Sequence, residues 1–400
     1  MPTGGAAVRM PRRFEARRQG VLARTGILSM DLWLLFAAVA LIVFSVYTLA
    51  AATQDDVPGT PLYYVVRQAI YAVVGIALMF SVMSIDYSRF RELRVGLYAA
   101  LIASISLVLV VGGATRGSRR WIELPFFRFQ PSELGKMLVI AALAGFVLDR
   151  TRKSDDRRRT VRLLTLGLAP AAIVFLQPDL GTGMVYAVIT AAILFLAGIK
   201  ASHFAAIGAA AVALMVVAFA IAPAIGTPVL RGYQQTRLTA FLHPSGDPSD
   251  SGYQVNQALI AVGSGQKTGR GDDATQTRLD FIPERHTDFI FAVIGERFGF
   301  VGAAFVLSLY SLLIWRALRI VTLSKNLYGT LVAGGIVAML MFQVFVNVGM
   351  SIGIMPVTGV PLPLMSYGGS SVLVTFIAMG ILQSVHVHSR RGSPGRDFSY

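Results

Sequence analysis

The chain has 400 residues, of which 54% are hydrophobic and 14% are charged, with a formal net charge of +15 and no cysteine. Soluble domains carry about 25% charged residues, so this composition excludes an ordinary soluble globular protein. The lack of cysteine excludes disulfides, thiol chemistry and cysteine-ligated metals. No motif for reading nucleic acid accompanies the positive charge, so we expect no nucleic-acid partner.

The chain begins with a basic segment, 1–29, which contains six arginines and runs into about 20 apolar residues. Because this apolar run is longer than that of a signal peptide, we interpret it as an uncleaved first helix. Further runs of this kind predict an all-α integral membrane protein with ten transmembrane helices, since a helix needs about 20 residues to cross a bilayer. The expected helices cover residues 32–52, 62–85, 95–113, 132–148, 163–176, 180–199, 204–226, 287–315, 327–353 and 366–385.

The positions of lysine and arginine indicate the orientation of these helices. With ten spans, 23 of the 36 Lys and Arg residues lie on the face that holds both termini, ten lie on the opposite face and three lie within spans. Because positive loops favour the cytoplasmic side, we expect both termini in the cytoplasm. The predicted organisation is one membrane domain, 30–388, followed by a cytoplasmic tail, 389–400.

The segment 115–130 departs from the orientation rule, because it is expected outside and yet is basic. Its arginines bind either an anionic ligand at the outer leaflet or the phosphates of the surrounding membrane lipids. They are Arg116, Arg119, Arg120 and Arg128.

The next span contains Glu133 and Lys136, which a spacing of three residues places on one helix face. They form either a structural ion pair or a pair in which Lys136 faces a cavity that holds an anion. The longest segment without a span follows later, at 227–286, as a large extracellular loop between the seventh and eighth helices. A loop of this length is uncommon unless it has a function.

The segment after this loop brings several polar residues together. Thr287 can cap a helix that begins beside Asp288, which would place the carboxylate at the positive end of the helix and at the outer membrane boundary. Glu284, Arg285 and His286 lie within the same few residues. Asp288 is therefore either a helix cap or a functional carboxylate.

Two functions suit Asp288. Sugar transfer with inversion needs a base that takes a proton from the acceptor hydroxyl. Alternatively, one carboxylate and a pyrophosphate can hold a divalent cation such as Mg²⁺ or Mn²⁺. We expect no organic cofactor.

A proline- and glycine-rich tract, 355–371, separates the last two spans. Three prolines prevent a regular helix, and irregular backbone at membrane depth must be buried in protein or line a cavity. This tract forms either re-entrant packing or part of a lipid-binding groove.

Taken together, these motifs resemble the SEDS family (shape, elongation, division and sporulation). The matching segments occur in one order over some 250 residues. They are 117–122, 130–136, 177–182, 252–254 with Gln257, 260–265, 281–295 and 359–371.

The resemblance implies a peptidoglycan glycosyltransferase that polymerises lipid II on the outer face of the bacterial cytoplasmic membrane and releases undecaprenyl pyrophosphate. Asp288 matches the essential acid of the family. Arg119 and Arg120 would bind pyrophosphate, and Glu133 and Lys136 would shape a central cavity. The remaining expected substrate-binding residues are Trp121, Glu284, Arg285, His286, Thr287 and Ser370.

By resemblance, the partner is a class B penicillin-binding protein, a transpeptidase. Arg285 between Glu284 and His286 is more typical of the elongation branch of the family than of the division branch. Gln266 replaces a glycine that is frequent in the family, and Arg297 replaces an acidic residue. The alternatives are a lipid II flippase, which needs a polar path through the bilayer, and a non-catalytic scaffold for the transpeptidase.

Overall fold

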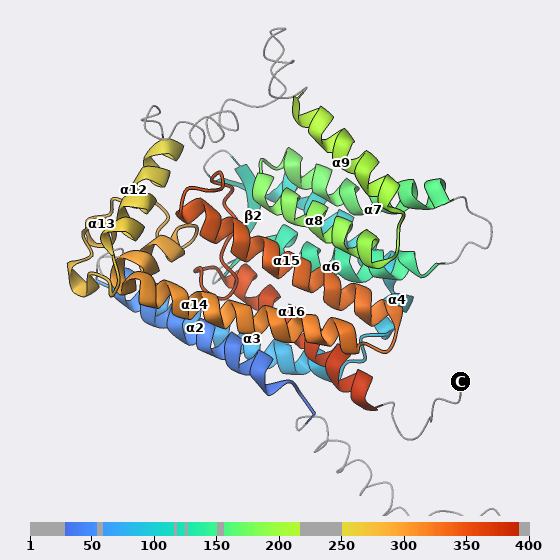
Figure 1. Cartoon of the computed structure of the whole chain (residues 1–400), viewed down its shortest axis with the longest axis horizontal. Helices are drawn as coiled ribbons and strands as arrows, with labels where there is room; N and C mark the ends of the chain where they lie inside the picture. The colour runs from blue at the N-terminus through green and yellow to red at the C-terminus, as the bar shows by residue number, and fades with distance from the viewer. Residues whose placement is uncertain are drawn as a thin grey trace, which may run out of the picture.

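A computed structural model describes residues 29–53, 59–115, 118–124, 127–149, 156–216 and 250–391. The chain is mostly helical, and its long helices lie side by side (Figure 1). The helices are α2 (Leu32–Ala52), α3 (Tyr63–Ser84), α4 (Arg89–Glu92), α5 (Arg94–Val111), α6 (Pro131–Val147), α7 (Asp156–Leu176), α8 (Leu180–Leu196), α9 (Ala201–Val216), α12 (Asp250–Ser264), α13 (Thr275–Arg278), α14 (Ile290–Leu323), α15 (Leu327–Ser351) and α16 (Gly369–Arg391), with a 3-10 turn η2 (Gly271–Asp273).

Within the described residues, six helices are long and apolar enough to cross a membrane: α2, α3, α7, α14, α15 and α16. The helix α2 follows the apolar run on which it was predicted. Asp31 caps it by accepting a hydrogen bond from the amide of Leu34. The helix α7 begins seven residues before the predicted start, because its first turn consists of Asp156 and three arginines, which carry no hydropathy signal. The described part of the seventh predicted helix is α9, and the rest, 217–226, lies outside the described residues.

A small antiparallel sheet interrupts the helices, which the all-α prediction missed. Its strands are β1 (Gly113–Thr115), β2 (Ser118–Leu124) and β3 (Phe127–Phe129), in the order β1-β2-β3. Gly113 pairs with Trp121, and Ile122 pairs with Phe129. The strands are so short that neither the alternation of residues nor hydropathy distinguishes them from a loop.

The connecting segments gather at two ends of the helical bundle. At one end, Tyr87 accepts a hydrogen bond from the side chain of Asn326 (2.9 Å), and Arg94 pairs with Asp149. Figure 1 places α4 at this end and α12 and α13 at the opposite end. The segments that the charge pattern assigns to one face are therefore close together in space.

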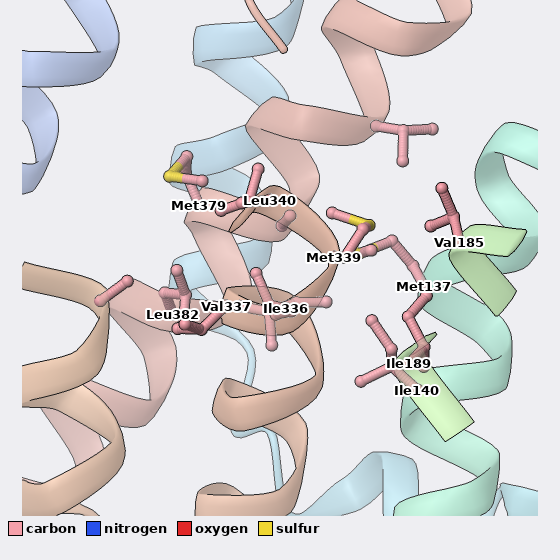
Figure 2. Close-up of a cluster of buried hydrophobic side chains, with 14 of the residues drawn as sticks. Met137, Ile140, Val185, Ile189, Ile336, Val337, Met339, Leu340, Met379 and Leu382 are labelled. Atoms are coloured by element: carbon pink, nitrogen blue, oxygen red, sulfur yellow. The ribbon is translucent and has the colours of Figure 1, made fainter. Parts of the chain in front are cut away.

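The core lies between α6, α8, α15 and α16, where apolar side chains from the four helices interdigitate (Figure 2). In lipid, helices associate through close van der Waals packing, for which small residues are favourable. Between α3 and α16, a methyl group added at Gly380 would lie 2.7 Å from the carbonyl oxygen of Met79. The backbones of α3 and α16 approach each other closely at this point.

The segment predicted as the long loop is described from residue 250 onwards, and it packs against a break in α14. Gly299 has φ +63° and ψ −158°, so the helical hydrogen bonds are interrupted there. The amides of Phe300 and Val301 donate instead to the carbonyls of Gln266 (2.9 Å) and Lys267 (3.1 Å). The break therefore fastens the end of α12 to α14.

Candidate functional site

The residues predicted around Asp288 form a compact turn just before α14. The carbonyl oxygen of Glu284 accepts hydrogen bonds from the amides of Thr287 (3.1 Å), Asp288 (3.1 Å) and Phe289 (3.3 Å). Glu284 adopts φ +54°, which costs a residue other than glycine of the order of 1–2 kcal/mol. The surrounding contacts hold this strained turn, so the position of Asp288 is closely defined.

The predicted cap by Thr287 is wrong. The helix begins at Ile290, three residues later than expected, and Phe289 occupies the cap position without a side-chain hydrogen bond. The hydroxyl of Thr287 donates to the carboxylate of Glu284 (2.8 Å), because the backbone of 283–289 is a turn rather than helix. Asp288 is half-buried and therefore retains access to a reactant.

Aromatic residues cover one side of this turn. The ring of His286 packs on Tyr64 at 4.6 Å between centroids and meets Tyr367 at 5.9 Å. The amide of Tyr367 donates to the carbonyl of His286 (2.8 Å).

Most residues of the tract 355–368 are buried, and side chains satisfy the irregular backbone. Ser45 donates to the carbonyl of Met365 (2.6 Å), and Gln68 donates to that of Ser366 (3.2 Å). Asn347 donates to the carbonyl of Val360 (2.8 Å). Within the tract, the hydroxyl of Ser366 accepts from the amide of Leu362. These bonds supply the partners that buried non-helical backbone needs.

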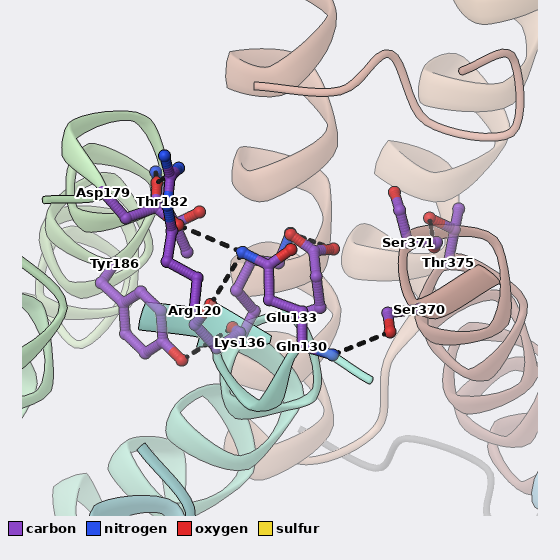
Figure 3. A network of polar contacts seen from close by, with 11 residues as sticks. Arg120, Gln130, Glu133, Lys136, Asp179, Thr182, Tyr186, Ser370, Ser371 and Thr375 are labelled. Atoms are coloured by element: carbon purple, nitrogen blue, oxygen red, sulfur yellow. Dashed lines mark hydrogen bonds and ion pairs between the residues drawn. The ribbon is translucent and has the colours of Figure 1, made fainter. Parts of the chain in front are cut away.

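A second polar cluster surrounds Asp179, which is 2% exposed and caps α8 (Figure 3). Its carboxylate accepts from the side-chain amide of Gln130 (3.1 Å) and from the backbone amide of Thr182 (3.1 Å). The guanidinium of Arg120 lies 3.8 Å from it. The side chain of Arg120 is 26% exposed, so Asp179 holds a cation that reaches the surface.

Beside this cluster, Lys136 and Glu133 form the ion pair that their spacing predicts. The ammonium lies 2.7 Å from both carboxylate oxygens, and both residues are buried. Removing either partner would leave a buried charge without its counterion. The hydroxyl of Ser370 accepts from the amide of Gln130 (3.0 Å) and donates to the carbonyl of Arg128 (3.0 Å), which fixes the junction of β3 and α6 (Figure 3).

The two groups of residues meet through the tract. A methyl group at Gly181, next to the Asp179 cap, would lie 2.5 Å from the carbonyl oxygen of Thr358. One residue further, a methyl group at Gly359 would lie 3.5 Å from Oδ2 of Asp288. The residues 358–360 therefore separate the carboxylate of Asp288 from the start of α8 by a single layer of backbone.

The other predicted site residues have varied positions. Arg285 is buried, pairs with Asp280 and donates to the carbonyl of Thr277 in α13 (2.9 Å). These contacts favour a structural role for Arg285, which attaches α13 to the turn before α14. Trp121 lies on β2, and the side chain of Arg119 is outside the described part of the structure. Gln130, Asp179 and Asn347 were not predicted as site residues. For Asp179, the signal was a charged residue beside a span.

A cation site built from protein alone is not found in the described residues, which contain no group of three or more His, Cys, Asp or Glu side chains that could hold a metal ion. A cation bound at Asp288 would need most of its ligands from a bound phosphate compound or from water.

Fold and site together define a polytopic membrane protein with two polar clusters at one end of its helical bundle. A family model described as "Cell cycle protein", which represents FtsW, RodA and SpoVE, matches residues 28–391. The chain belongs to this family, known as SEDS.

Among curated relatives, peptidoglycan glycosyltransferase MrdB of Escherichia coli K12 is 37% identical over 362 residues, 90% of this chain and 94% of the relative. A probable peptidoglycan glycosyltransferase FtsW of Thioalkalivibrio sulfidiphilus is 37% identical over 378 residues, 92% of each chain. One solved chain has a TM-score of 0.75 and 32% identity to this chain, and the match covers 90% of this chain and 98% of the solved one. It comes from work on structural coordination of polymerization and crosslinking by a peptidoglycan synthase complex.

Proposed function

We propose that the turn at Asp288 and the cluster at Arg120 carry out glycan polymerisation from lipid II. The chain is a peptidoglycan glycosyltransferase, as its curated relatives are named, and it resembles them over nearly its whole length. The observation that carries the proposal is that the chain presents two suitable groups. One is the half-buried carboxylate of Asp288 on a strained turn, and the other is the partly exposed guanidinium of Arg120, which the buried carboxylate of Asp179 holds.

In this proposal, Asp288 removes the proton from the acceptor hydroxyl as that oxygen attacks the anomeric carbon of the donor sugar. The bond from that carbon to the pyrophosphate breaks, and undecaprenyl pyrophosphate leaves. Arg120 compensates the negative charge of the leaving group, since a planar guanidinium suits phosphate oxygens. Asp179 keeps Arg120 in place, and the buried Glu133–Lys136 pair supports the wall behind it.

A divalent cation is part of the proposal as an auxiliary. Mg²⁺ or Mn²⁺ would bind to the Asp288 carboxylate and to pyrophosphate oxygens, a combination that Mg²⁺ commonly uses. When bound, it would neutralise charge on the leaving group. The test is the dependence of polymerisation on added cation after chelation.

The proposed topology has ten spans with both termini in the cytoplasm. The helices α5, α6, α8 and α9 have 16 to 18 described residues each and would complete the set begun by the six longer helices. Asp288 and Arg120 would then face the outer side of the cytoplasmic membrane.

We propose a role in elongation and cell shape, on the basis of Arg285 between Glu284 and His286. Identity to the MrdB and FtsW relatives is the same, 37%, so overall similarity favours neither branch. The proposed partner is a class B penicillin-binding protein, which is supported by the likeness to a chain from a complex that couples polymerization with crosslinking.

The decisive experiment is polymerisation of labelled lipid II by the full-length protein together with its transpeptidase partner. We expect Asp288→Asn and Asp288→Ala to lower the rate by about 10²–10⁴-fold, the usual contribution of a general base. Thr322→Ala, which removes an exposed hydroxyl at the other end of α14, is the control.

If both Asp288 variants polymerise at the wild-type rate, the base role is wrong. If wild type forms no polymer, a flippase assay in vesicles and a crosslinking assay of the partner distinguish the transporter and scaffold alternatives.

A further inference from the structure

Asn347 is a buried polar residue that the chemistry above does not use. It lies in α15, one turn before the end of that helix, and it is 0% exposed. A buried amide is costly unless its hydrogen bonds are made. A polar side chain in such a place therefore indicates a specific contact.

The two hydrogen bonds of Asn347 join two segments that are distant in the sequence. Its Nδ2 donates to the carbonyl of Asp288 (2.9 Å) and to the carbonyl of Val360 (2.8 Å). Carbonyl oxygens accept hydrogen bonds, so the NH₂ group of Asn347, rather than its Oδ1, must face these two carbonyls. Its Oδ1 is buried and has no hydrogen-bond partner in the described part of the chain. Within that part, the side chain therefore serves the junction of Asp288 with the tract 355–368 and nothing else.

This junction determines where the carboxylate of Asp288 lies. Val360 follows Gly359, which has a left-handed φ of +73°. A methyl group added at Gly359 would lie 3.5 Å from Oδ2 of Asp288, so the backbone at Gly359 is close to the carboxylate. Loss of the Asn347 bonds would let the turn at Asp288 and residues 359–360 move apart. Only a terminal amide supplies two donors within this space; serine supplies one, and leucine supplies none.

We propose that Asn347 is a positioning residue, which holds the backbone of Asp288 against Val360 so that the carboxylate is aimed at the acceptor hydroxyl. This inference rests on the proposed base role of Asp288. A displacement of about 1 Å at a reacting group lowers the rate by about 10²-fold. In the proposed function, Arg120, which does not contact Asn347, holds the pyrophosphate of the substrate, so kcat should fall while KM changes little.

The test compares kcat and KM for lipid II polymerisation in the full-length protein with its partner. Asn347→Leu keeps the branched shape and the number of side-chain heavy atoms and removes both donors, and Asn347→Ser keeps one donor. We expect kcat to fall about 10–100-fold in the leucine variant and less in the serine variant, with KM within about twofold of wild type. The matched control is Ser351→Ala, which removes a buried hydroxyl one turn further along α15 that donates to the backbone carbonyl of Asn347 (3.0 Å) and leaves both donors of the Asn347 side chain in place. It should keep wild-type kcat.

Unfolding temperature in detergent verifies that each variant is folded. If the leucine variant does not fold, the serine variant decides. Wild-type kcat in a folded Asn347 variant, or a raised KM with unchanged kcat, contradicts the inference, provided that Asp288→Asn is inactive. If Asp288→Asn is fully active, the base role fails first and the positioning role fails with it.

Discussion

Replacing Glu296 by glutamine should release α13 from α14. Glu296 is 0% exposed, and its carboxylate accepts three hydrogen bonds. The donors are the amide of Gln276 (2.8 Å), the amide of Thr277 (2.8 Å) and the hydroxyl of Thr277 (2.6 Å). The carbonyl of Thr277 in turn accepts from Arg285, so the same contact supports the turn that carries Asp288.

The expected loss follows from the geometry. A glutamine can keep its oxygen at the position that bonds Thr277, but its NH₂ group then faces the amide of Gln276, and two donors oppose each other. At least one hydrogen bond to a charged acceptor disappears, which costs about 1.5–3 kcal/mol. Taking about 2 kcal/mol, local opening of α13 becomes about 30-fold more frequent, since 1.4 kcal/mol is a factor of ten.

Hydrogen–deuterium exchange of the peptide that contains Gln276 and Thr277 measures this opening directly. We expect exchange about 30-fold faster in Glu296→Gln, together with slower polymerisation. The control is Asp272→Asn, which removes a carboxylate that is 97% exposed and pairs with Arg297 (2.7 Å). Exposed pairs contribute at most about 1 kcal/mol, so the control should change exchange about fivefold at most.

Unchanged exchange at Gln276 and Thr277 in the Glu296 variant would refute the reasoning. So would an equal increase in the Asp272 control, because the effect would then come from the surface of the loop rather than from the buried carboxylate.

Gln266→Gly should raise the unfolding temperature in detergent, because Gln266 adopts φ +47° and glycine relieves a backbone strain of about 1–2 kcal/mol there. The greater conformational entropy of glycine in the unfolded chain offsets this by up to about 1 kcal/mol. A lower unfolding temperature would contradict the prediction. Asp31→Asn should destabilise the protein by about 3 kcal/mol at neutral pH, since it breaks the buried pair with Arg316. Burial acts to raise the pKa of Asp31, but the Arg316 hydrogen bond, the Leu34 amide and the arginine charge outweigh it and lower the pKa below its ordinary value of 3.8. The stabilisation is therefore complete above that value and disappears as the pH falls through the lower folded pKa. The difference in unfolding temperature between wild type and Asp31→Asn should become smaller only below about pH 4. A difference that is constant down to pH 3 would show that the charge of Asp31 does not contribute to stability.

Helices that span an apolar environment were predictable, because one property, a run of apolar residues, determines them. The predicted helix 32–52 has the observed bounds Leu32–Ala52, and 327–353 differs from Leu327–Ser351 by two residues. Where the helix extends into polar sequence, as at the start of α7, hydropathy gives no signal. The sheet was missed because the arginines of β2 indicated an anion site, and strands of three to seven residues leave little pattern.

The site was predictable only where it depends on local spacing. Glu133 and Lys136 share a face because they are three residues apart, and the structure confirms their contact. The contact of Gln130 with Asp179 spans 49 residues, and that of Asn347 with Asp288 spans 59. Such contacts depend on how helices pack, which no local pattern encodes. The assignment of Thr287 as a cap failed because turn and helix N-terminus use the same residue types.

The length of α14 determines the depth at which the reaction would take place. Beyond the break at Gly299, the 24 residues from Phe300 to Leu323 rise about 36 Å, whereas the hydrocarbon layer of a membrane is about 30 Å thick. The residues Ile290–Glu296 at the start of the helix are all buried, so protein rather than lipid surrounds them. If the remainder crosses the hydrocarbon, this protein-covered first part rises to the level of the lipid headgroups. A lipid-linked sugar could then reach Asp288 while its isoprenoid chain stays among the acyl chains. The polar sugar would not have to enter the hydrocarbon layer.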